Sequence, residues 1–275
     1  MLVFVLNAGS SSLKYQLIDI KSKELKASGL VERIGIDGIL KHEIGENKKI
    51  TFELPIPTHK EAIELVLRIL TNDETKVINS IDEIKAIGHR VVHGGEHFKG
   101  SVIVDDEVIR KIEELIPLAP LHNPANILGV KICKDLMPKV PNVVTFDTAF
   151  HQTMPMENFL YAVPYADYTE HHLRKYGFHG TSHYYVSQEA IKLLNKKDSK
   201  VIVCHLGNGS SVCAVKDGKS ISTSMGLTPL EGLIMGTRAG DIDAGVIPYL
   251  MEKKNLSSNQ ILDYLNKKSG ILGVS

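Results

Sequence analysis

The chain has 275 residues, 43% of them hydrophobic, with 32 basic against 32 acidic side chains. Domains usually contain about 100 to 200 residues, so this length favours two domains that each have enough apolar residues for a core. The composition excludes a disordered, collagen-like or disulfide-stapled chain. A net charge of zero gives no global attraction to nucleic acid or anionic lipid, so any bound anion must be held by locally placed groups.

The three cysteines, Cys133, Cys204 and Cys213, lack metal-ligand spacing and are odd in number. This pattern favours reduced thiols, and we expect all three to be core residues. The sequence has no basic leader ahead of an apolar run and no apolar stretch of about 18 residues. We therefore expect a soluble, cytoplasmic protein without nucleic-acid or membrane partners.

The N-terminal part of the chain predicts a meander of β-strands, and the remainder predicts strands that alternate with helices. The meander strands are expected at 3–6, 13–20, 25–31, 39–44 and 49–54, with a turn at 45–47 in the last hairpin. Thr58 and Glu61 have capping-box spacing at the start of a helix with an apolar face that reaches Leu70. Further helices are expected at 105–116, 125–136, 182–194 and 258–267, and further strands at 86–92, 143–146 and 201–206. This order indicates an α/β fold class with two domains, 1–150 and 151–275.

A strand–turn–strand pattern rich in glycine and serine occurs twice. Residues 3–13 (VFVLNAGSSSL) resemble residues 201–212 (VIVCHLGNGSSV). The two segments are either unrelated hairpins with favoured turn residues or an internal duplication in which each lobe presents one hairpin to a shared cleft. Glycine–serine turns bring backbone N–H groups close to an anion, so two such turns suit a polyphosphate. Lys14 is either a solvated side chain or a point charge for that phosphate.

The segment 88–97 (GHRVVHGGEH) allows two interpretations. His89, His93 and His97 are four residues apart and would form a zinc-binding face on a helix. The glycines and valines of the segment instead favour a strand that runs into a turn, where residues four apart are about 13 Å apart. In that case Arg90 is the functional candidate, because a guanidinium can hold a carboxylate or phosphate with two hydrogen bonds.

Three later segments place single charged or titratable groups beside turns. Asp147 ends an apolar strand and is a candidate for Mg²⁺ binding or for activation of a nucleophile, or it caps a turn. His179 lies between Phe178 and Gly180 ahead of a helix, where it would face an anion or simply occupy a loop. Arg238 lies in a glycine-punctuated loop, and a second isolated arginine suits charge stabilisation of a transferring phosphoryl group. Serine hydrolysis is disfavoured because the sequence has no Gly-x-Ser-x-Gly elbow.

Taken together, these motifs resemble those of the acetate kinase (acetokinase) family. The resemblance runs from Met1 to Ser275 and rests on residues 7–14, 88–95, 146–151, 176–183, 205–209 and 235–238. It implies the two-lobed acetate and sugar kinase/Hsc70/actin superfamily fold, which is ribonuclease H-like and has duplicated lobes. It also implies reversible phosphoryl transfer from ATP to acetate, giving ADP and acetyl phosphate with Mg²⁺ or Mn²⁺, by a homodimer.

The resemblance also implies roles for individual residues. Asn7 would lie near the metal and Lys14 near the nucleotide phosphates, and Arg90 would bind the substrate carboxylate. Asp147 would be the catalytic acid, with His179 and Arg238 as transition-state stabilisers. The second phosphate loop would be formed by His205, Leu206, Gly207, Asn208 and Gly209, and the pocket for the acetate methyl by Val92, Leu121, Phe178 and Pro229.

The sequence departs from the family in length. Family members continue beyond the position of Ser275 with an adenine-binding segment and a metal-binding glutamate, so we expect an incomplete second lobe and little turnover by these 275 residues alone. Residues 270–275 are predicted to form an apolar loop. Alternative functions are a propionate or butyrate kinase, a chaperone-like ATPase of the same superfamily, and a zinc hydrolase that uses His89, His93 and His97.

Overall fold

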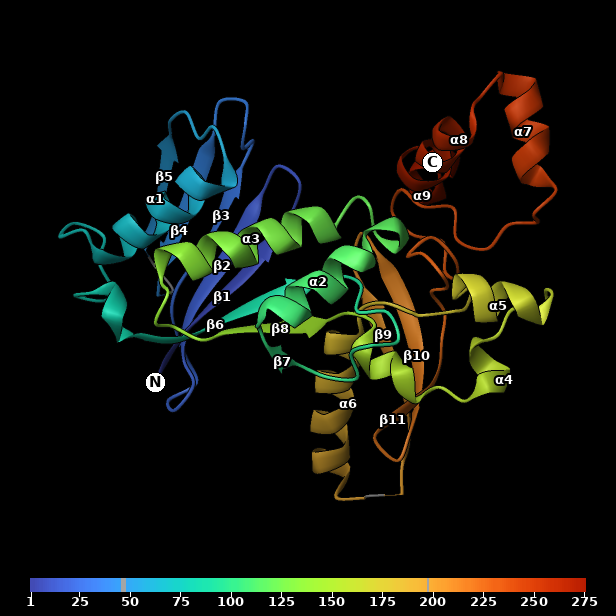
Figure 1. The fold of residues 1–275 in the computed structure, drawn as a ribbon, viewed down its shortest axis with the longest axis horizontal. Helices are drawn as coiled ribbons and strands as arrows, with labels where there is room; N and C mark the ends of the chain where they lie inside the picture. The colour runs from blue at the N-terminus through green and yellow to red at the C-terminus, as the bar shows by residue number, and fades with distance from the viewer. Residues whose placement is uncertain (46–47, 197) are drawn as a thin grey trace. The chain divides into compact units, whose positions relative to one another are not determined.

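A computed structural model of the chain describes residues 1–45, 48–196 and 198–275 (Figure 1). The chain divides into two compact units, Met1–Phe146 (unit 1) and Asp147–Ser275 (unit 2). The division therefore falls after Phe146 rather than after residue 150. Two residues of the predicted turn at 45–47, Glu46 and Asn47, lie outside the described residues.

Unit 1 is built on an eight-stranded mixed sheet with the order β5-β4-β3-β2-β1-β6-β8-β7. Its strands are β1 (Leu2–Ala8), β2 (Leu13–Asp19), β3 (Glu24–Glu32), β4 (Ile39–Ile44), β5 (Lys48–Glu53), β6 (Ile84–Val91), β7 (Val102–Ile103) and β8 (Asn142–Phe146). The predicted meander β1 to β5 is confirmed, with each strand antiparallel to the next. β6 is parallel to both β1 and β8, so the carboxyl ends of these three strands lie at one edge of the sheet.

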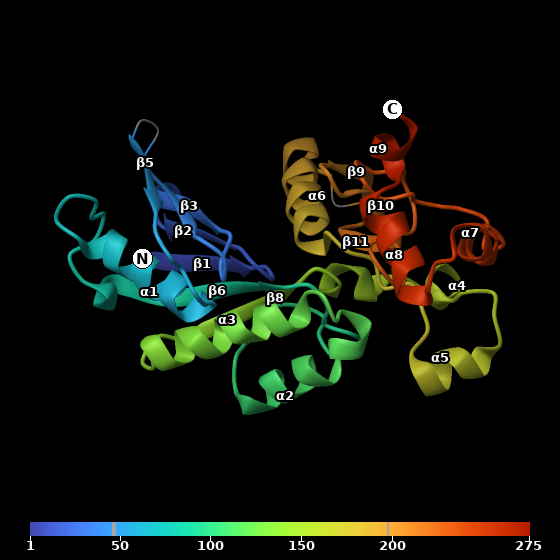
Figure 2. The same cartoon turned by 90° about the horizontal axis from the view of Figure 1, so that it is seen from above.

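The helices of unit 1 cover one face of this sheet (Figures 1 and 2). They are α1 (His59–Thr71), α2 (Asp106–Glu114) and α3 (Asn123–Leu136), with short 3₁₀ turns η1 (Ile81–Glu83) and η2 (Ile116–Leu118). Thr58 caps α1, as predicted, by accepting a hydrogen bond from the Lys60 N–H. α3 packs against α1, β1 and β6. Every second side chain of β2 (Leu13, Tyr15, Leu17) is at most 2% exposed and belongs to the core.

Unit 2 contains a three-stranded antiparallel sheet with the order β11-β10-β9. The strands are β9 (Lys200–Leu206), β10 (Ser210–Lys216) and β11 (Lys219–Thr223). Its helices are η3 (Ala149–Thr153), α4 (Met156–Phe159), α5 (Tyr165–His171), α6 (Gly180–Leu194), α7 (Val246–Lys254), α8 (Ser258–Lys267) and α9 (Gly270–Val274). α6 packs on β9, and η3 packs on β11 and α6. None of the helices in the described ranges is long and apolar enough to cross a membrane.

Two expectations about unit 2 are wrong. Residues 270–275 are not a loop: Gly270 has a φ of +65°, which starts the short helix α9, and the N–H of Ile271 bonds to the Met235 carbonyl. Cys204 is exposed, whereas Cys133 and Cys213 are buried. The reason is that side chains alternate along β9, and Cys204 lies on the face opposite the buried Val203.

Candidate active site

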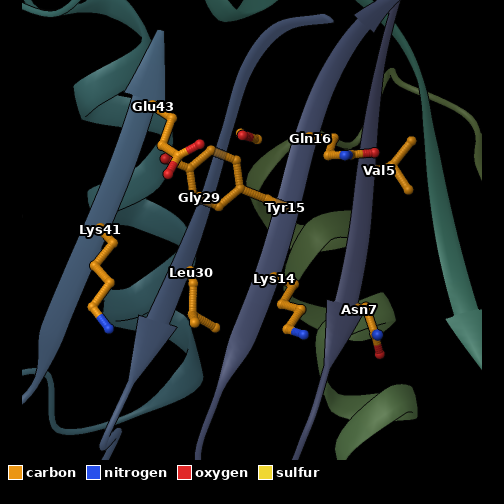
Figure 3. Close-up of a pocket in the computed structure, with 10 residues that line it drawn as sticks. Val5, Asn7, Lys14, Tyr15, Gln16, Gly29, Leu30, Lys41 and Glu43 are labelled. Carbon is orange, nitrogen blue, oxygen red and sulfur yellow. The ribbon is translucent and has the colours of Figure 1, made fainter. Parts of the chain in front are cut away.

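Asn7, Lys14 and Arg90 lie close together at one edge of the unit 1 sheet. Asn7 and Lys14 are opposite each other in the β1–β2 pair, and both line a hollow of about 460 Å³ on the sheet (Figure 3). Arg90 lies near the end of β6, where its Nη1 is 3.5 Å from Asn7 Oδ1. Lys14 and Arg90 are exposed. The edge therefore offers two cationic side chains to an anionic ligand, and the Asn7 amide oxygen accepts from one of them.

The turn between β1 and β2 is anchored by two side chains that the sequence analysis did not single out. The Gly9 N–H bonds to the Ser12 carbonyl at 2.8 Å. His59 Nε2 lies 2.7 Å from the Gly9 carbonyl oxygen. Asn126 is 3% exposed; it donates to the Ala8 carbonyl at 2.7 Å and accepts from the Val92 N–H at 3.0 Å. Asn126 therefore holds the β1–β2 turn and Val92, a predicted substrate residue, in a fixed arrangement.

The predicted methyl-pocket residues differ in exposure. Val92 and Phe178 are 5% and 2% exposed, whereas Leu121 is 69% exposed. Pro229 is half-buried, and its carbonyl accepts from Arg238 Nη1 at 3.0 Å. Val92 and Leu121 belong to unit 1, and Phe178 and Pro229 to unit 2.

The histidines of segment 88–97 do not form a metal site. His89 Nε2 is 2.7 Å from Asn142 Oδ1, and His93 Nδ1 accepts from the Gly95 N–H at 3.0 Å. Burial lowers the pKa of His89 and that of His93 to about 4. His97 is exposed, and no group of three or more His, Cys, Asp or Glu side chains in the described part of the chain could hold a metal ion. The segment is a strand that runs into a turn, as the second interpretation predicted, and not a helix. The zinc-hydrolase interpretation is therefore not supported.

Asp147 is 2% exposed and lies beside the start of α6. Its carbonyl accepts from the Gly180 N–H at 2.8 Å. A Cβ at position 180 would lie 2.2 Å from that carbonyl oxygen, so only glycine allows this approach. Burial lowers the pKa of His151 to about 4, although the hydrogen bond to the Phe178 carbonyl and the nearby charge of Asp147 oppose this shift.

His179 caps α6 with a left-handed backbone (φ 60°). Its Nδ1 is 2.9 Å from Ser211 Oγ, and its ring lies 4.0 Å from that of His205, centroid to centroid. His205 Nδ1 is in turn 2.9 Å from Ser182 Oγ. The two imidazoles predicted from the motifs are therefore in contact within unit 2.

The second glycine turn lies against Arg238. β9 and β10 pair from Leu206 and Ser210, so Gly207, Asn208 and Gly209 form the turn. A Cβ on Gly209 would lie 3.2 Å from Arg238 Nη1 and 3.6 Å from His179 Nε2. Burial lowers the pKa of the Arg238 guanidinium. The structure thus brings the β9–β10 glycine turn, His179 and Arg238 together.

Comparison with known proteins gives the family. A sequence model of the acetokinase family matches residues 2–275. The chain belongs to the acetokinase family. It is 57% identical over 277 residues to the acetate kinase of Lachnoclostridium phytofermentans and 55% identical over 278 residues to that of Caldanaerobacter subterraneus subsp. tengcongensis. These alignments include 100% of this chain but 70% and 69% of those proteins.

Solved structures of acetokinase-family proteins have the same fold. The Porphyromonas gingivalis acetate kinase superposes with a TM-score of 0.96 at 48% identity, covering 100% of this chain and 69% of that one. A propionate kinase from Francisella tularensis superposes with a TM-score of 0.93 at 45% identity, covering 99% and 70%. The fold class is therefore the two-lobed α/β class of acetate and propionate kinases, as predicted.

The residues fit a divalent cation that keeps much of its own hydration. Within each unit taken by itself, one oxygen of a kind that Mg²⁺ prefers is present: the Asn7 amide oxygen in unit 1 and the buried Asp147 carboxylate in unit 2. Mg²⁺ is usually held by one or two protein oxygens together with waters and substrate phosphates rather than by a complete protein cage.

Proposed function

We propose that this acetokinase-family chain transfers the terminal phosphoryl group of ATP to acetate, giving ADP and acetyl phosphate, and catalyses the reverse reaction. The family match over residues 2–275 supports the reaction class. The observation that carries the proposal for this chain is the convergence of Arg238, His179 and the Gly207–Gly209 turn in unit 2. Cationic and N–H donors around a glycine turn suit the charge of a phosphoryl group in transfer.

The chemistry requires charge neutralisation more than proton transfer. A carboxylate oxygen of acetate forms a bond to the γ-phosphorus, the bond from that phosphorus to the β–γ bridging oxygen breaks, and ADP leaves with the electron pair. Acetate has a pKa close to that of a glutamate side chain, about 4.3, and is already ionised at neutral pH. The main obstacle is the approach of one anion to another.

In unit 1, we propose that Arg90 binds the acetate carboxylate and Lys14 the nucleotide phosphates. Arg90 is exposed near the strand end, where both nitrogens of its guanidinium fork can reach a carboxylate. Val92 and Leu121 from this unit, with Phe178 and Pro229 from unit 2, are proposed to contact the acetate methyl.

In unit 2, we propose that Arg238 and His179 donate hydrogen bonds to the transferring phosphoryl group, while residues His205 to Gly209 hold the nucleotide phosphates. Asp147 and Asn7 would hold a divalent metal, which we propose to be Mg²⁺ with Mn²⁺ as a substitute. When bound, the metal would neutralise phosphate charge. Because acetate needs no general base, we propose that Asp147 acts through the metal and its waters rather than by proton transfer.

A pH profile tests the role of Asp147. If Asp147 works through the metal, wild type and Asp147→Asn differ in kcat and in metal requirement but have the same shape of pH profile at saturating metal. A titration present in wild type and absent in Asp147→Asn would instead establish proton transfer.

The proposed function is tested by trapping acyl phosphate with hydroxylamine in the complete gene product, with acetate, propionate and butyrate as acceptors. We expect ATP-dependent hydroxamate with acetate as the preferred acid. Preference for propionate would establish the alternative that the Francisella tularensis propionate kinase suggests. ATP hydrolysis without hydroxamate from any acid would contradict the proposal and favour the chaperone-like ATPase. We further propose a cytoplasmic homodimer, which gel filtration with light scattering tests.

A further inference from the structure

A buried serine and a buried histidine lie directly behind His179. Ser211 is on β10 and His183 is one turn along α6 from His179; both are 0% exposed. Ser211 Oγ is 2.9 Å from His179 Nδ1 and 2.7 Å from His183 Nε2. One hydroxyl therefore connects His179, the proposed hydrogen-bond donor to the transferring phosphoryl group, to a buried histidine.

The hydroxyl has one proton and two lone pairs, so it can donate to only one of the two rings. Ser211 is 0% exposed and its Oγ has no other hydrogen-bond partner among the described residues, so its proton is satisfied only if it donates to one ring and accepts from the other. Burial lowers the pKa of His183 to about 3, so at neutral pH this ring is uncharged and has a single N–H. Its Nδ1 is buried and has no hydrogen-bond partner among the described residues. A buried N–H without an acceptor is rarer than an unpaired acceptor, so the proton belongs on Nε2, where it is donated to Ser211.

The direction of the second hydrogen bond follows from the first. Because Ser211 accepts from His183, its own proton is donated to His179 Nδ1. A neutral His179 must then carry its proton on Nε2. Nε2 is the nitrogen beside Gly209, 3.6 Å from the position of a Cβ there, and Arg238 Nη1 lies 3.2 Å from the same point.

We propose that Ser211 and His183 are positioning residues that hold His179 as the Nε2–H tautomer, with its N–H directed toward the transferring phosphoryl group. This inference rests on the proposed function only for its catalytic consequence. A neutral imidazole can otherwise carry its proton on either nitrogen and turn about its side-chain bonds. The hydrogen-bonded chain fixes both the protonated nitrogen and the orientation of the ring. His179 can therefore donate to phosphate oxygens without first taking up a proton.

The test is the tautomer of His179 in the 275-residue chain with ¹⁵N-labelled histidine, read from long-range ¹H–¹⁵N correlation spectra at pH 7.5. The signals are assigned with His179→Gln. We expect an unprotonated Nδ1 and a protonated Nε2. An Nδ1–H tautomer or a doubly protonated ring would overturn the proposal, and this readout does not depend on enzymatic activity.

Variants then test the relay, meaning the hydrogen-bonded chain from His183 through Ser211 to His179. In the complete gene product, Ser211→Ala should lower kcat about tenfold with a smaller change in KM for acetate and ATP, because one fixed hydrogen bond is lost. The same substitution should give mixed tautomers, and Ser211→Thr, which keeps the hydroxyl, should restore the single one. Normal kcat together with an unchanged tautomer in Ser211→Ala would contradict the relay. If Ser211→Ala does not fold, His183→Gln and the wild-type spectrum still decide whether the tautomer of His179 is fixed. Absence of hydroxamate formation by the wild type would count against the proposed function alone.

Discussion

The two glycine-rich hairpins have similar sequences, but different neighbours hold them in place. The β1–β2 hairpin lies inside an eight-stranded sheet, and its turn is fixed by His59 and Asn126 from two helices. The β9–β10 hairpin includes the edge strand of a three-stranded sheet, and its turn contacts Arg238 and the Gly236 N–H. The first turn is held by helix residues for which we propose no catalytic role, whereas the second turn lies against Arg238, which we propose for catalysis.

This difference indicates in which unit the proposed site residues also support the local fold. In unit 1, the charged candidates Lys14 and Arg90 are exposed and can change without disturbing a core. In unit 2, His179 and Arg238 are half-buried and bond to Ser211 and to the Pro229 carbonyl. We therefore expect substitutions in the unit 2 site to affect both catalysis and local structure.

The largest effect is expected from the two arginines. Arg90→Ala and Arg238→Ala should each lower kcat by about 10³-fold, because each guanidinium neutralises charge during phosphoryl transfer. Arg90→Ala should also raise KM for acetate. Hydroxamate formation by the complete gene product measures both constants. Arg33→Ala, which removes an exposed guanidinium paired with Asp37, is the matched control and should be silent. Near-normal turnover in either site variant would refute its assignment.

Acidification should destabilise both units through buried histidines. The pKa values of His89 and His93 in unit 1 and His151 in unit 2 fall to about 4, and that of His183 to about 3, mainly by burial. The unfolded chain takes up these protons near pH 6.5, so stability is complete above that pH and is lost as the pH falls toward the folded values. The slope approaches about 1.4 kcal/mol per histidine and pH unit only well below pH 6.5. Between pH 6.5 and 5.5 each histidine therefore costs about 1 kcal/mol, and the two in each part of the chain together cost about 2 kcal/mol.

Hydrogen exchange of β6 and β10 amides measures the two units separately. The stability of both strands should fall over this pH range. His97→Gln, at an exposed histidine, should leave the pH dependence unchanged. A free energy of opening in β10 that does not change with pH, after correction for the intrinsic exchange rate, would show that unit 2 does not bury its histidines as described.

Gly29→Ala should destabilise unit 1 by about 2 kcal/mol, because overpacking this partly buried, closely packed site forces neighbours to move. A Cβ there would lie 2.5 Å from the Tyr15 ring and from the Lys41 carbonyl oxygen. The Tyr15 ring crosses this glycine and its hydroxyl lies 2.5 Å from His42 Nδ1. Urea unfolding followed by tyrosine fluorescence measures the loss. Gly100→Ala, where nothing lies within 4 Å of the added Cβ, should cost little. An equal effect of the two substitutions would show that the close packing at Gly29 is not the cause.

Alternating burial and side-chain caps made much of the fold predictable. The meander strands and the helices that begin after Thr58, Asp105 and Ser257 have such signals, and each of these caps accepts a backbone N–H. Helix α7 was missed because it starts at Gly245 with no side-chain cap, and β7 because it has two residues. Helix α9 depends on hydrogen bonds to the distant Met235 and Gly236 carbonyls, which local sequence does not reveal.

The candidate site was predictable where a motif keeps its residues close in sequence. The glycine turns and strand-end charges belong to this class. Ser211 and His183 were missed as partners of His179 because Ser211 lies 32 residues away and meets the histidines only when β10 packs beside α6. The four-residue spacing of His179 and His183 at the start of a helix was the available signal, since residues i and i+4 share a helix face.

The smallest effect is expected from the two glycines of the second turn. Neither has a positive φ, so an added methyl acts through space alone. At Gly209 the methyl would lie 3.2 Å from Arg238 Nη1 and displace it, so Gly209→Ala should lower kcat/KM for ATP about tenfold, as expected for a weakened charge-assisted hydrogen bond. At Gly207 the methyl would meet only the Gly209 carbonyl oxygen, at 3.4 Å, and the loss should be smaller. Steady-state kinetics of the two variants side by side measure this. A larger loss in Gly207→Ala would contradict this explanation. It would mean that glycine is required because the phosphates approach the turn directly, and not because a methyl group would displace Arg238.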